Sequence, residues 1–411
     1  MPSDRRAADE AYVWIWLPEA SEPIVAGRVV KTGNRHLFTY GQSYRARVAA
    51  IPLSPFELPL EPGTFEPEGM HVIHTCLRDA APDAWGRRVL EYRYPASSLG
   101  ELDYLLLSGS DRIGALDFQA SATEYVARDS SQIGLDELIQ AADRIESGQP
   151  LPPELDAALL HGTSVGGARP KALITDAHTH YIAKFSSTTD VYPIVKAEYI
   201  AMRLGQLVGL SVAPVKFTQS LSRDVLLVKR FDRVYREGEV YRRGLLSGLS
   251  LLRLHEMEAR YASYRDLADL IRQRFMNPAQ QLEELFKRLV FNVLIGNTDD
   301  HARNHAAFWD GRHLDLTPAY DICPQMRTGQ EASQAMDIGG VEGRLSTLKN
   351  VLSTCSAFQL DEVRARGLIE EIAAVIERQW GSVCDEVHLS PMERTRLWRR
   401  VVLNPYCFQA W

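Results

Sequence analysis

Residues 297–304 read Asn-Thr-Asp-Asp-His-Ala-Arg-Asn, and residues 316–321 read Leu-Thr-Pro-Ala-Tyr-Asp. Within them Asn304 follows Asp299 by five positions, and Asp321 lies on the next apolar segment. ATP-dependent phosphotransferases need such a set, because one carboxylate orients or deprotonates the attacking hydroxyl while an amide and a second carboxylate hold Mg²⁺ against the triphosphate. Oxygen ligands suit Mg²⁺, which takes only one or two protein carboxylates. The spacing therefore predicts Asp299 as the catalytic aspartate, with Asn304 and Asp321 as Mg²⁺ ligands.

The segment before this loop, residues 282–294, predicts a helix with one buried stripe, because its apolar residues recur at helical spacing. Gly296 is a natural helix stop. The polar loop would then begin at the edge of a packed core, where catalytic groups are usually found. The alternative is that these residues only cap the helix and solvate a turn, although capping needs one such residue rather than several.

Two further loop residues are harder to assign. His301 could hydrogen-bond within the loop or touch the γ-phosphate, and we favour the structural role. Asp300 is expected to face solvent, although it could exchange roles with Asp299. The five-residue step to Asn304 favours Asp299 as the catalytic residue.

The composition is that of an ordinary globular protein with room for two or three domains: 411 residues, 45% hydrophobic and 24% charged. Residues 1–30 lack a basic-then-apolar signal segment, and no apolar run approaches the roughly 20 residues of a membrane span. The five cysteines are scattered without a CxxC pair, which favours reduced thiols in a cytoplasmic protein over disulfides or a zinc site. A net charge of −7 argues against broad nucleic-acid binding by this chain alone, although a local basic patch stays open.

The chain divides into four predicted parts. Residues 1–125 predict a β-rich amino-terminal subdomain, and the polar, proline-containing residues 126–158 predict a connecting segment. Residues 159–235 mix strands with one helix and predict a β-rich small lobe, whereas residues 236–411 predict a helical large lobe. This order predicts an α+β protein in which a nucleotide lies between two lobes. In the first part we expect strands over 12–17, 23–30 and 36–40 and helices over 79–92 and 103–107.

A small-residue loop enters the predicted small lobe just before a strand over 172–175. Adjacent glycines let backbone amides approach phosphate oxygens, and Arg169 or Lys171 adds positive charge. The loop is neither a Walker A motif nor a GxGxxG motif, so an ordinary strand-entry turn is the alternative. The residues predicted to contact phosphate here are Ser164, Val165, Gly166, Gly167, Ala168, Arg169 and Lys171.

A hairpin is predicted from 172–175 to 181–185. On its second strand, alternation places Ile182 and Lys184 on one face. Glu198 shares a small, apolar helix face with Ala201 and would be partly buried, so it needs a cation. Lys184 is therefore predicted to contact nucleotide phosphates, Glu198 or both, against the alternative of a plain surface pair.

Residues 226–232 read as a strand leaving the small lobe. Such a crossing segment can offer backbone groups to the adenine edge, with Val228 and Phe231 as apolar neighbours. A core strand is the equal alternative.

With these pieces in order, the chain resembles the HipA-type serine/threonine kinases, the toxins of a bacterial toxin–antitoxin family. The resemblance rests on the motifs above together with residues 229–233, and on two motifs of the amino-terminal part, residues 77–87 and 109–116. It implies a two-lobed protein-kinase-like fold with an additional amino-terminal subdomain, and it implies ATP and Mg²⁺ as cofactors.

The resemblance also implies roles for residues and partners. Asp299 would be the catalytic aspartate, Lys184 the phosphate-contacting lysine and Ser164 an autophosphorylated serine whose modification ejects the glycine loop. Family kinases phosphorylate a serine of an aminoacyl-tRNA synthetase, glutamyl- or tryptophanyl-, and are restrained by a small helix-turn-helix antitoxin. DNA would then be contacted only indirectly. At the hinge-like position before Arg230, Lys229 departs from the glutamate expected there.

Three hypotheses follow. The first is an ATP- and Mg²⁺-dependent protein serine/threonine kinase that inhibits translation. The second is a co-repressor or binding module that acts with a helix-turn-helix antitoxin on DNA, with catalysis secondary. The third is a small-molecule or lipid kinase of the same architecture, which would differ only in its acceptor.

Overall fold

The computed structural model describes residues 7–95, 98–128, 134–149, 163, 169–176, 178–187 and 190–411. The chain forms two compact units, each of which gathers segments that are far apart in the sequence. Unit 1 contains residues 1–187, 219–246 and 308–312, and unit 2 contains residues 188–218, 247–307 and 313–411. The division into four consecutive parts stays a prediction.

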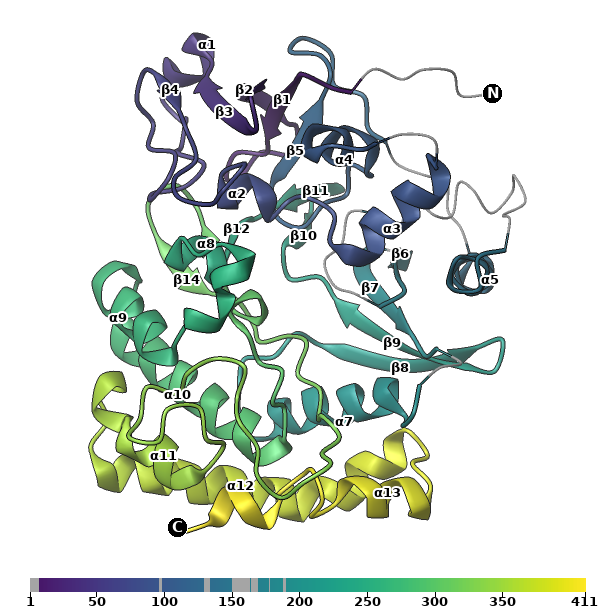
Figure 1. Ribbon diagram of the computed structural model, residues 1–411, viewed down its shortest axis with the longest axis vertical. Helices are drawn as coiled ribbons and strands as arrows, with labels where there is room; N and C mark the ends of the chain where they lie inside the picture. The colour runs from purple at the N-terminus through teal and green to yellow at the C-terminus, as the bar shows by residue number, and fades with distance from the viewer. Residues whose placement is uncertain are drawn as a thin grey trace. The chain divides into compact units, whose positions relative to one another are not determined.

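The amino-terminal part of unit 1 is built on an antiparallel sheet with the strand order β4-β3-β2-β1-β5 (Figure 1). Along its third strand His36, Phe38 and Tyr40 are buried and alternate with more exposed residues, because successive strand side chains point to opposite faces. The predicted strands are confirmed, with ends shifted by one or two residues. The strands are β1 (Glu10–Ile15), β2 (Ile24–Thr32), β3 (Arg35–Tyr40), β4 (Thr64–Phe65) and β5 (Leu116–Gln119).

The helices of this part partly differ from the prediction. The helix predicted over 79–92 is wrong at its start, because the chain forms α2 (Thr75–Arg78) and then α3 (Ala84–Arg93). Pro82 explains the break, since proline lacks a backbone N–H and disfavours helical backbone in the preceding residue. The helix predicted over 103–107 is confirmed as α4 (Glu101–Leu107), and a short α1 spans Gln42–Arg45.

The second part of unit 1 contains a helix that the prediction missed. The segment expected to be a polar connection contains α5 (Leu135–Glu146). Its apolar side chains join a buried cluster with α3 and with the strands that follow. That cluster contains Trp85 and Val89 of α3, Leu138, Ile139, Ala142 and Ile145 of α5, and Ala172, Ala183, Phe185 and Val225.

The strands beside α5 form an antiparallel hairpin within a sheet of order β6-β7-β9-β8. These strands are β6 (Lys171–Asp176), β7 (Thr179–Phe185), β8 (Val215–Ser220) and β9 (Arg223–Lys229), so the predicted hairpin is confirmed and the strand predicted over 226–232 ends at Lys229. A second hairpin pairs β10 (Arg233–Arg236) with β11 (Glu239–Arg242). A further sheet has the order β12-β13-β14, with strands Gly244–Ser247, Ala306–Trp309 and Leu314–Leu316.

Unit 2 is mainly helical and is centred on α10 (Pro278–Ile295), which confirms the helix predicted over 282–294. Every residue of α10 from Arg288 to Ile295 is buried, because α9 and α12 both pack against it. The other helices are α7 (Ile194–Leu207), α8 (Gly248–Leu252), α9 (Tyr264–Arg274), α11 (Leu348–Ser353), α12 (Glu362–Glu386) and α13 (Pro391–Leu397). Short 3₁₀ turns lie at Glu256–Tyr261, Ala302–Asn304, Cys355–Phe358 and Pro405–Phe408.

Two further findings concern the cysteines and the search for membrane-spanning helices. Cys76, Cys323, Cys355, Cys384 and Cys407 are all free thiols, as predicted. Within the described ranges, no helix is both long and apolar enough to cross a membrane.

Candidate active site

The predicted catalytic loop begins where α10 ends. Gly296 adopts a φ of +76°, a left-handed conformation that glycine reaches without steric cost. A Cβ atom at this position would lie 2.7 Å from both the Cγ1 and the carbonyl oxygen of Val401, so the close approach of the chain also requires glycine. The loop is therefore fixed to the most buried helix of unit 2.

A network of buried hydrogen bonds holds the loop in place. The Nδ2 of Asn297 donates to the Oδ1 of Asn292 at 3.0 Å, and the Nδ2 of Asn292 donates to the hydroxyl of Tyr264 at 3.1 Å. The Tyr264 hydroxyl in turn donates to Asp300, whose Oδ2 also lies 3.0 Å from the Nε2 of His305. The network links α9 and α10 to both ends of the loop.

Asp300 is therefore not solvent-facing, and the prediction for it is wrong. Its residue is only 2% exposed, because Tyr264 and His305 enclose the carboxylate. Burial alone would raise the pKa of Asp300, but the charge of His305 and the hydrogen bonds from His305 and Tyr264 outweigh it and hold that pKa below its ordinary value. The same burial raises the pKa of Tyr264 well above its ordinary value. Asp300 is thus an acceptor inside the protein, which leaves Asp299 as the carboxylate that reaches solvent.

Asp299, Asn304 and Asp321 lie together. The residue Asp299 is exposed, and Asn304, which is buried, donates its Nδ2 to the Asp299 carbonyl oxygen at 3.4 Å. Partial loss of hydration raises the pKa of the Asp299 carboxyl, the charge of His301 lowers it, and the carboxylates of Asp321 and Asp300 raise it further. The Asp321 carboxylate is therefore near enough to act on Asp299 electrostatically. A carboxylate whose pKa is raised by a neighbouring carboxylate marks a place that favours a cation.

The backbone at Asp321 is strained and firmly held. Its φ of +58° lies in the left-handed region that non-glycine residues rarely occupy, and such residues concentrate at functional sites. The preceding residues fix this conformation: the Ala319 amide donates to the Ser211 carbonyl at 2.7 Å, and the Tyr320 hydroxyl donates to the Arg303 carbonyl at 2.7 Å. The segment that carries Asp321 is thus tied directly to the segment that carries Asn304.

His301 lies half-buried beside Asp299. Its Nδ1 is buried and has no hydrogen-bond partner among the described residues. That His301 has a structural role rather than a phosphate contact stays a prediction.

The donor set fits Mg²⁺. The side chains of Asp321 and Asn304 offer one carboxylate and one amide oxygen, which matches the few protein oxygens that Mg²⁺ takes. The described residues contain no group of three or more His, Cys, Asp and Glu side chains that could hold a metal ion, so a transition-metal cage is not formed by them.

In unit 1 the strands β6, β7 and β9 form a sheet with two different faces. Tyr181, Ala183 and Phe185 are buried on one face, and Ala183 and Phe185 belong to the cluster with α3 and α5. Lys184 lies on the other face, which confirms the prediction that it shares a face with Ile182. On the neighbouring strand β6, Lys171 lies directly opposite Lys184.

The register also clarifies the hinge residues. Lys229 pairs with Tyr181 and therefore lies on the face opposite to Lys184, whereas Val228 pairs with Ile182 and shares the Lys184 face. A nucleotide on the Lys184 face would meet the backbone of Lys229 rather than its side chain. Phe231 packs edge-to-face against Phe308, with ring centroids 5.8 Å apart.

The remaining predicted residues are placed as follows. Glu198 is 7% exposed on α7, as its apolar helix face predicted, and Arg169 lies half-buried just before β6. The residues Ser164, Val165, Gly166, Gly167 and Ala168 lie outside the described residues.

Sequence reasoning missed the supporting residues of the loop. Tyr264, Asn292 and His305 are all buried, and a polar residue inside an apolar helical stripe, such as Asn292, was the available signal.

Comparison with known proteins now places the chain. The HipA-like C-terminal domain family matches residues 163–380, and the HipA N-terminal domain family matches residues 19–119. The chain belongs to the HipA-type kinase family.

Individual relatives cover parts of the chain. The putative kinase Y4mE of Sinorhizobium fredii is 30% identical over 151 residues, which are 34% of this chain and 33% of that protein. The serine/threonine-protein kinase toxin HipA of Shewanella oneidensis is 27% identical over 242 residues, 52% of this chain and 54% of the toxin. The chain thus spans about a third to a half of these curated relatives.

A solved structure extends the likeness to almost the whole chain. The complex of Shewanella oneidensis HipA with HipB and operator DNA contains a chain that matches with a TM-score of 0.68 at 21% identity. The match covers 92% of this chain and 94% of that chain. The HipA-type protein described here therefore has the α+β kinase-like fold.

Proposed function

We propose that the chain is an ATP- and Mg²⁺-dependent serine/threonine protein kinase. The observation that carries the proposal is that Asp299 and Asn304, on a loop held by buried hydrogen bonds, lie close to Asp321 on the neighbouring segment. Membership of the HipA-type kinase family supports the same activity.

The residues divide the chemistry between them. Asp299, the carboxylate that reaches solvent, accepts the proton of the acceptor serine as its oxygen bonds to the γ-phosphorus and the bond to the β-phosphate oxygen breaks. The raised pKa of Asp299 suits this role, because a base works best when its pKa approaches the working pH. Asn304 and Asp321 would hold Mg²⁺, which neutralises phosphate charge.

The nucleotide-contacting residues are proposed within unit 1. Lys171 and Lys184 present two positive side chains on one sheet face, as a polyphosphate requires. Arg169 and the loop Ser164–Ala168 would add backbone and charge contacts, and the backbone at Lys229 and the ring of Phe231 would meet the base. Ser164 is the proposed autophosphorylation site.

The acceptor and partners are proposed from the family. A serine of an aminoacyl-tRNA synthetase such as glutamyl-tRNA synthetase is the proposed substrate, with inhibition of translation in the cytoplasm as the result. A helix-turn-helix antitoxin is the proposed partner, supported by the likeness to HipA in a complex with HipB and operator DNA. That complex also supports the second candidate, a co-repressor that acts on DNA through the antitoxin.

Replacement of one carboxylate tests the activity. Asp299→Asn should lower phosphate transfer from labelled ATP to protein in a cell lysate by at least about 10³-fold, because the general base is lost while the fold remains. The wild type should also carry phosphate on Ser164, located by peptide mapping. Asp310→Asn, which changes an exposed carboxylate in the turn between β13 and β14, is the matched control and should transfer normally.

Two outcomes would count against the kinase. Unchanged transfer by Asp299→Asn would remove the central assignment. A label found only on lipid or small molecules would favour the third hypothesis and leave the catalytic residues intact.

A further inference from the structure

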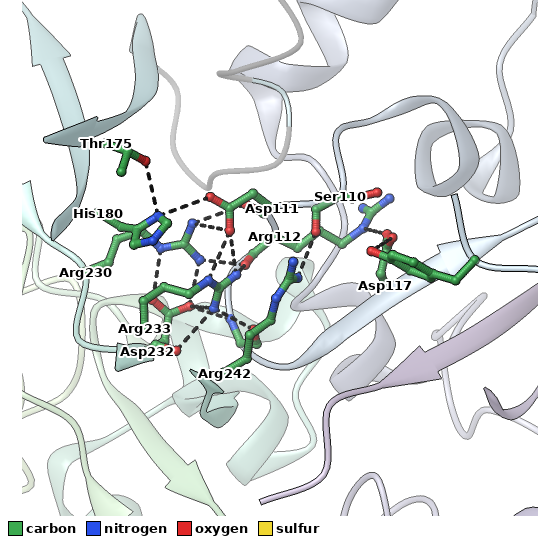
Figure 2. Close-up of polar contacts among 12 residues, drawn as sticks. Ser110, Asp111, Arg112, Asp117, Thr175, His180, Arg230, Asp232, Arg233 and Arg242 are labelled. Atoms are coloured by element: carbon green, nitrogen blue, oxygen red, sulfur yellow. Dashed lines mark hydrogen bonds and ion pairs between the residues drawn. The ribbon is translucent and has the colours of Figure 1, made fainter. Parts of the chain in front are cut away.

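Charged residues that the proposed chemistry does not use meet in a largely buried ion network in unit 1 (Figure 2). Asp111 belongs to the motif 109–116 of the amino-terminal part, and Arg230, Asp232 and Arg233 follow directly after β9. Asp111 accepts from Arg230 at 2.9 Å and from Arg233 at 2.8 Å. Asp232 accepts from the same two arginines at 2.8 and 3.0 Å. Each of the two carboxylates therefore contacts both guanidinium groups, and the four charges sum to zero.

Arg112 connects this network to the core of the amino-terminal part. Its carbonyl oxygen accepts from the Nη2 of Arg230 at 2.6 Å and also from Arg233. Its own side chain is fully buried and turns the other way, where its Nε donates to Asp117 on β5 at 2.7 Å and its Nη1 donates to the Ala80 carbonyl at 2.9 Å. Arg112 thus contacts the ion network through its carbonyl oxygen and the core of the amino-terminal part through its side chain.

Further hydrogen bonds that involve backbone atoms hold the region around the ion network. The Gly114 amide donates to the Oδ2 of Asp232 at 2.7 Å, and the Nη1 of Arg242 donates to the Ser110 carbonyl at 2.9 Å. The Arg230 amide donates to the His180 carbonyl at 2.9 Å, which ties the end of β9 to the start of β7.

All four ions keep their charge at neutral pH. Burial would raise the pKa of Asp232, yet Arg230 and Arg233 lower it to about 2. Burial and the neighbouring charge of Arg230 lower the pKa of Arg233 to about 10, which still leaves it protonated. Burial lowers the pKa of His180 below its ordinary value, so this histidine adds no positive charge. A satisfied network of this kind is rigid, because any movement would leave a buried charge unpaired.

The network lies immediately beside the proposed hinge. Lys229 is exposed and Phe231 is half-buried, whereas Arg230 and Asp232 between and after them are buried in the network. Within this short segment, Arg230 and Asp232 fix the chain to the amino-terminal part, while the backbone of Lys229 and the ring of Phe231 are the groups proposed to meet the nucleotide.

We propose that Asp111 and Arg230 are positioning residues for the nucleotide, and that the loop 110–114 of the amino-terminal part holds the hinge in its ATP-binding geometry. This inference rests on the proposed kinase function for its ligand. It assigns the amino-terminal part a direct role in nucleotide affinity, exerted through Arg230 and Asp232 on the backbone of Lys229.

Equilibrium binding and hydrogen exchange on the full chain test this role. Asp111→Asn should weaken binding of a fluorescent ATP analogue with Mg²⁺ by about 10-fold, because a hinge that keeps its ATP-binding geometry only about a tenth of the time binds about 10-fold more weakly. In the same variant, backbone amides of residues 229–233 should exchange faster without nucleotide. The turnover number at saturating ATP should change little, since Asp299, Asn304 and Asp321 are untouched.

Glu101→Gln is the matched control. It removes ion pairs elsewhere in the same unit: Arg87 Nη2 donates to both Glu101 oxygens at 2.8 and 2.7 Å, and Arg78 Nε lies 4.0 Å from Glu101 Oε2. It should leave ATP affinity and exchange at the hinge unchanged. If Asp111→Asn melts below the assay temperature, Arg233→Lys keeps the positive charge, loses the paired contacts of the guanidinium and should show the same effects in milder form.

The outcomes separate the two proposals. Wild-type affinity in Asp111→Asn and in Arg233→Lys, with unchanged exchange at 229–233, overturns the positioning role and leaves the kinase intact. A wild-type chain that binds no ATP removes the proposed function and the nucleotide role together, whereas the exchange measurement still shows whether the loop holds the hinge segment.

Discussion

At the scale of single residues, the buried carboxylate of Asp300 offers a stability test. It accepts from Tyr264 and His305 and is 2% exposed, so Asp300→Asn leaves a donor unpaired and removes a buried charge. We expect the free energy of unfolding at pH 7 to fall by about 3 kcal/mol. Tyr264→Phe removes a donor to Asp300 and the acceptor for Asn292 but keeps the charge of Asp300 beside His305, so it should cost less, about 2 kcal/mol. Chemical denaturation of each variant measures both values.

The same residue predicts a pH dependence. Because the folded-state pKa of Asp300 is lowered, its contribution is present above the unfolded pKa, about 4, and is lost as the pH falls through the folded value. The gap between wild type and Asp300→Asn should therefore narrow below about pH 4. A gap that is constant down to pH 2 would contradict the lowered pKa.

Asp299 and Asp300 also show what the sequence could and could not reveal. The spacing from Asp299 to Asn304 is a local pattern, and the amide of Asn304 does reach the Asp299 carbonyl. The burial of Asp300 depends on Tyr264, which lies 36 positions earlier on another helix, so no local pattern could place it. Neighbouring carboxylates with opposite pKa shifts differ through their tertiary surroundings alone.

At the scale of elements, we expect alanine to destabilise the protein to different extents at two glycines that follow helices. Gly296 ends α10 at a φ of +76° and Gly209 follows α7 at +79°, so alanine at either position pays about 1–2 kcal/mol for left-handed backbone. At Gly296 the new methyl group would also collide with Val401, whereas nothing lies within 4 Å at Gly209. We expect Gly296→Ala to lower the melting temperature clearly more than Gly209→Ala. Equal shifts would mean that the Val401 contact relaxes freely.

Elements with strong local patterns could be predicted, and the others could not. The buried stripe of α10 and the alternation of β7 followed from apolar spacing and were confirmed. Helix α5 also carries helical spacing, but its polar, proline-containing surroundings indicated a connection. The strand predicted over 226–232 ends at Lys229 because Arg230 and Asp232 leave the sheet to enter the ion network.

At the scale of the whole molecule, the compact units do not follow chain order. Unit 1 combines the amino-terminal part with residues 219–246, and the predicted consecutive parts could not show this, because long-range packing joins them. The junction uses both the ion network and the apolar cluster, in which Trp85 and Val89 of α3 pack with α5 and the strands β6, β7 and β9. A shared core of this kind makes its parts unfold together.

Trp85→Ala tests whether unit 1 unfolds as one body. Trp85 is 3% exposed, so its truncation should cost about 3–5 kcal/mol of stability. Because its contacts include the cluster with Ala183 and Phe185, hydrogen exchange should accelerate in β6 and β7 as much as in α3 itself. Faster exchange confined to residues 75–93 would instead show that the amino-terminal part opens alone. In that case it could not hold the hinge near Lys229, since a part that opens by itself transmits no constraint to the strands beside it.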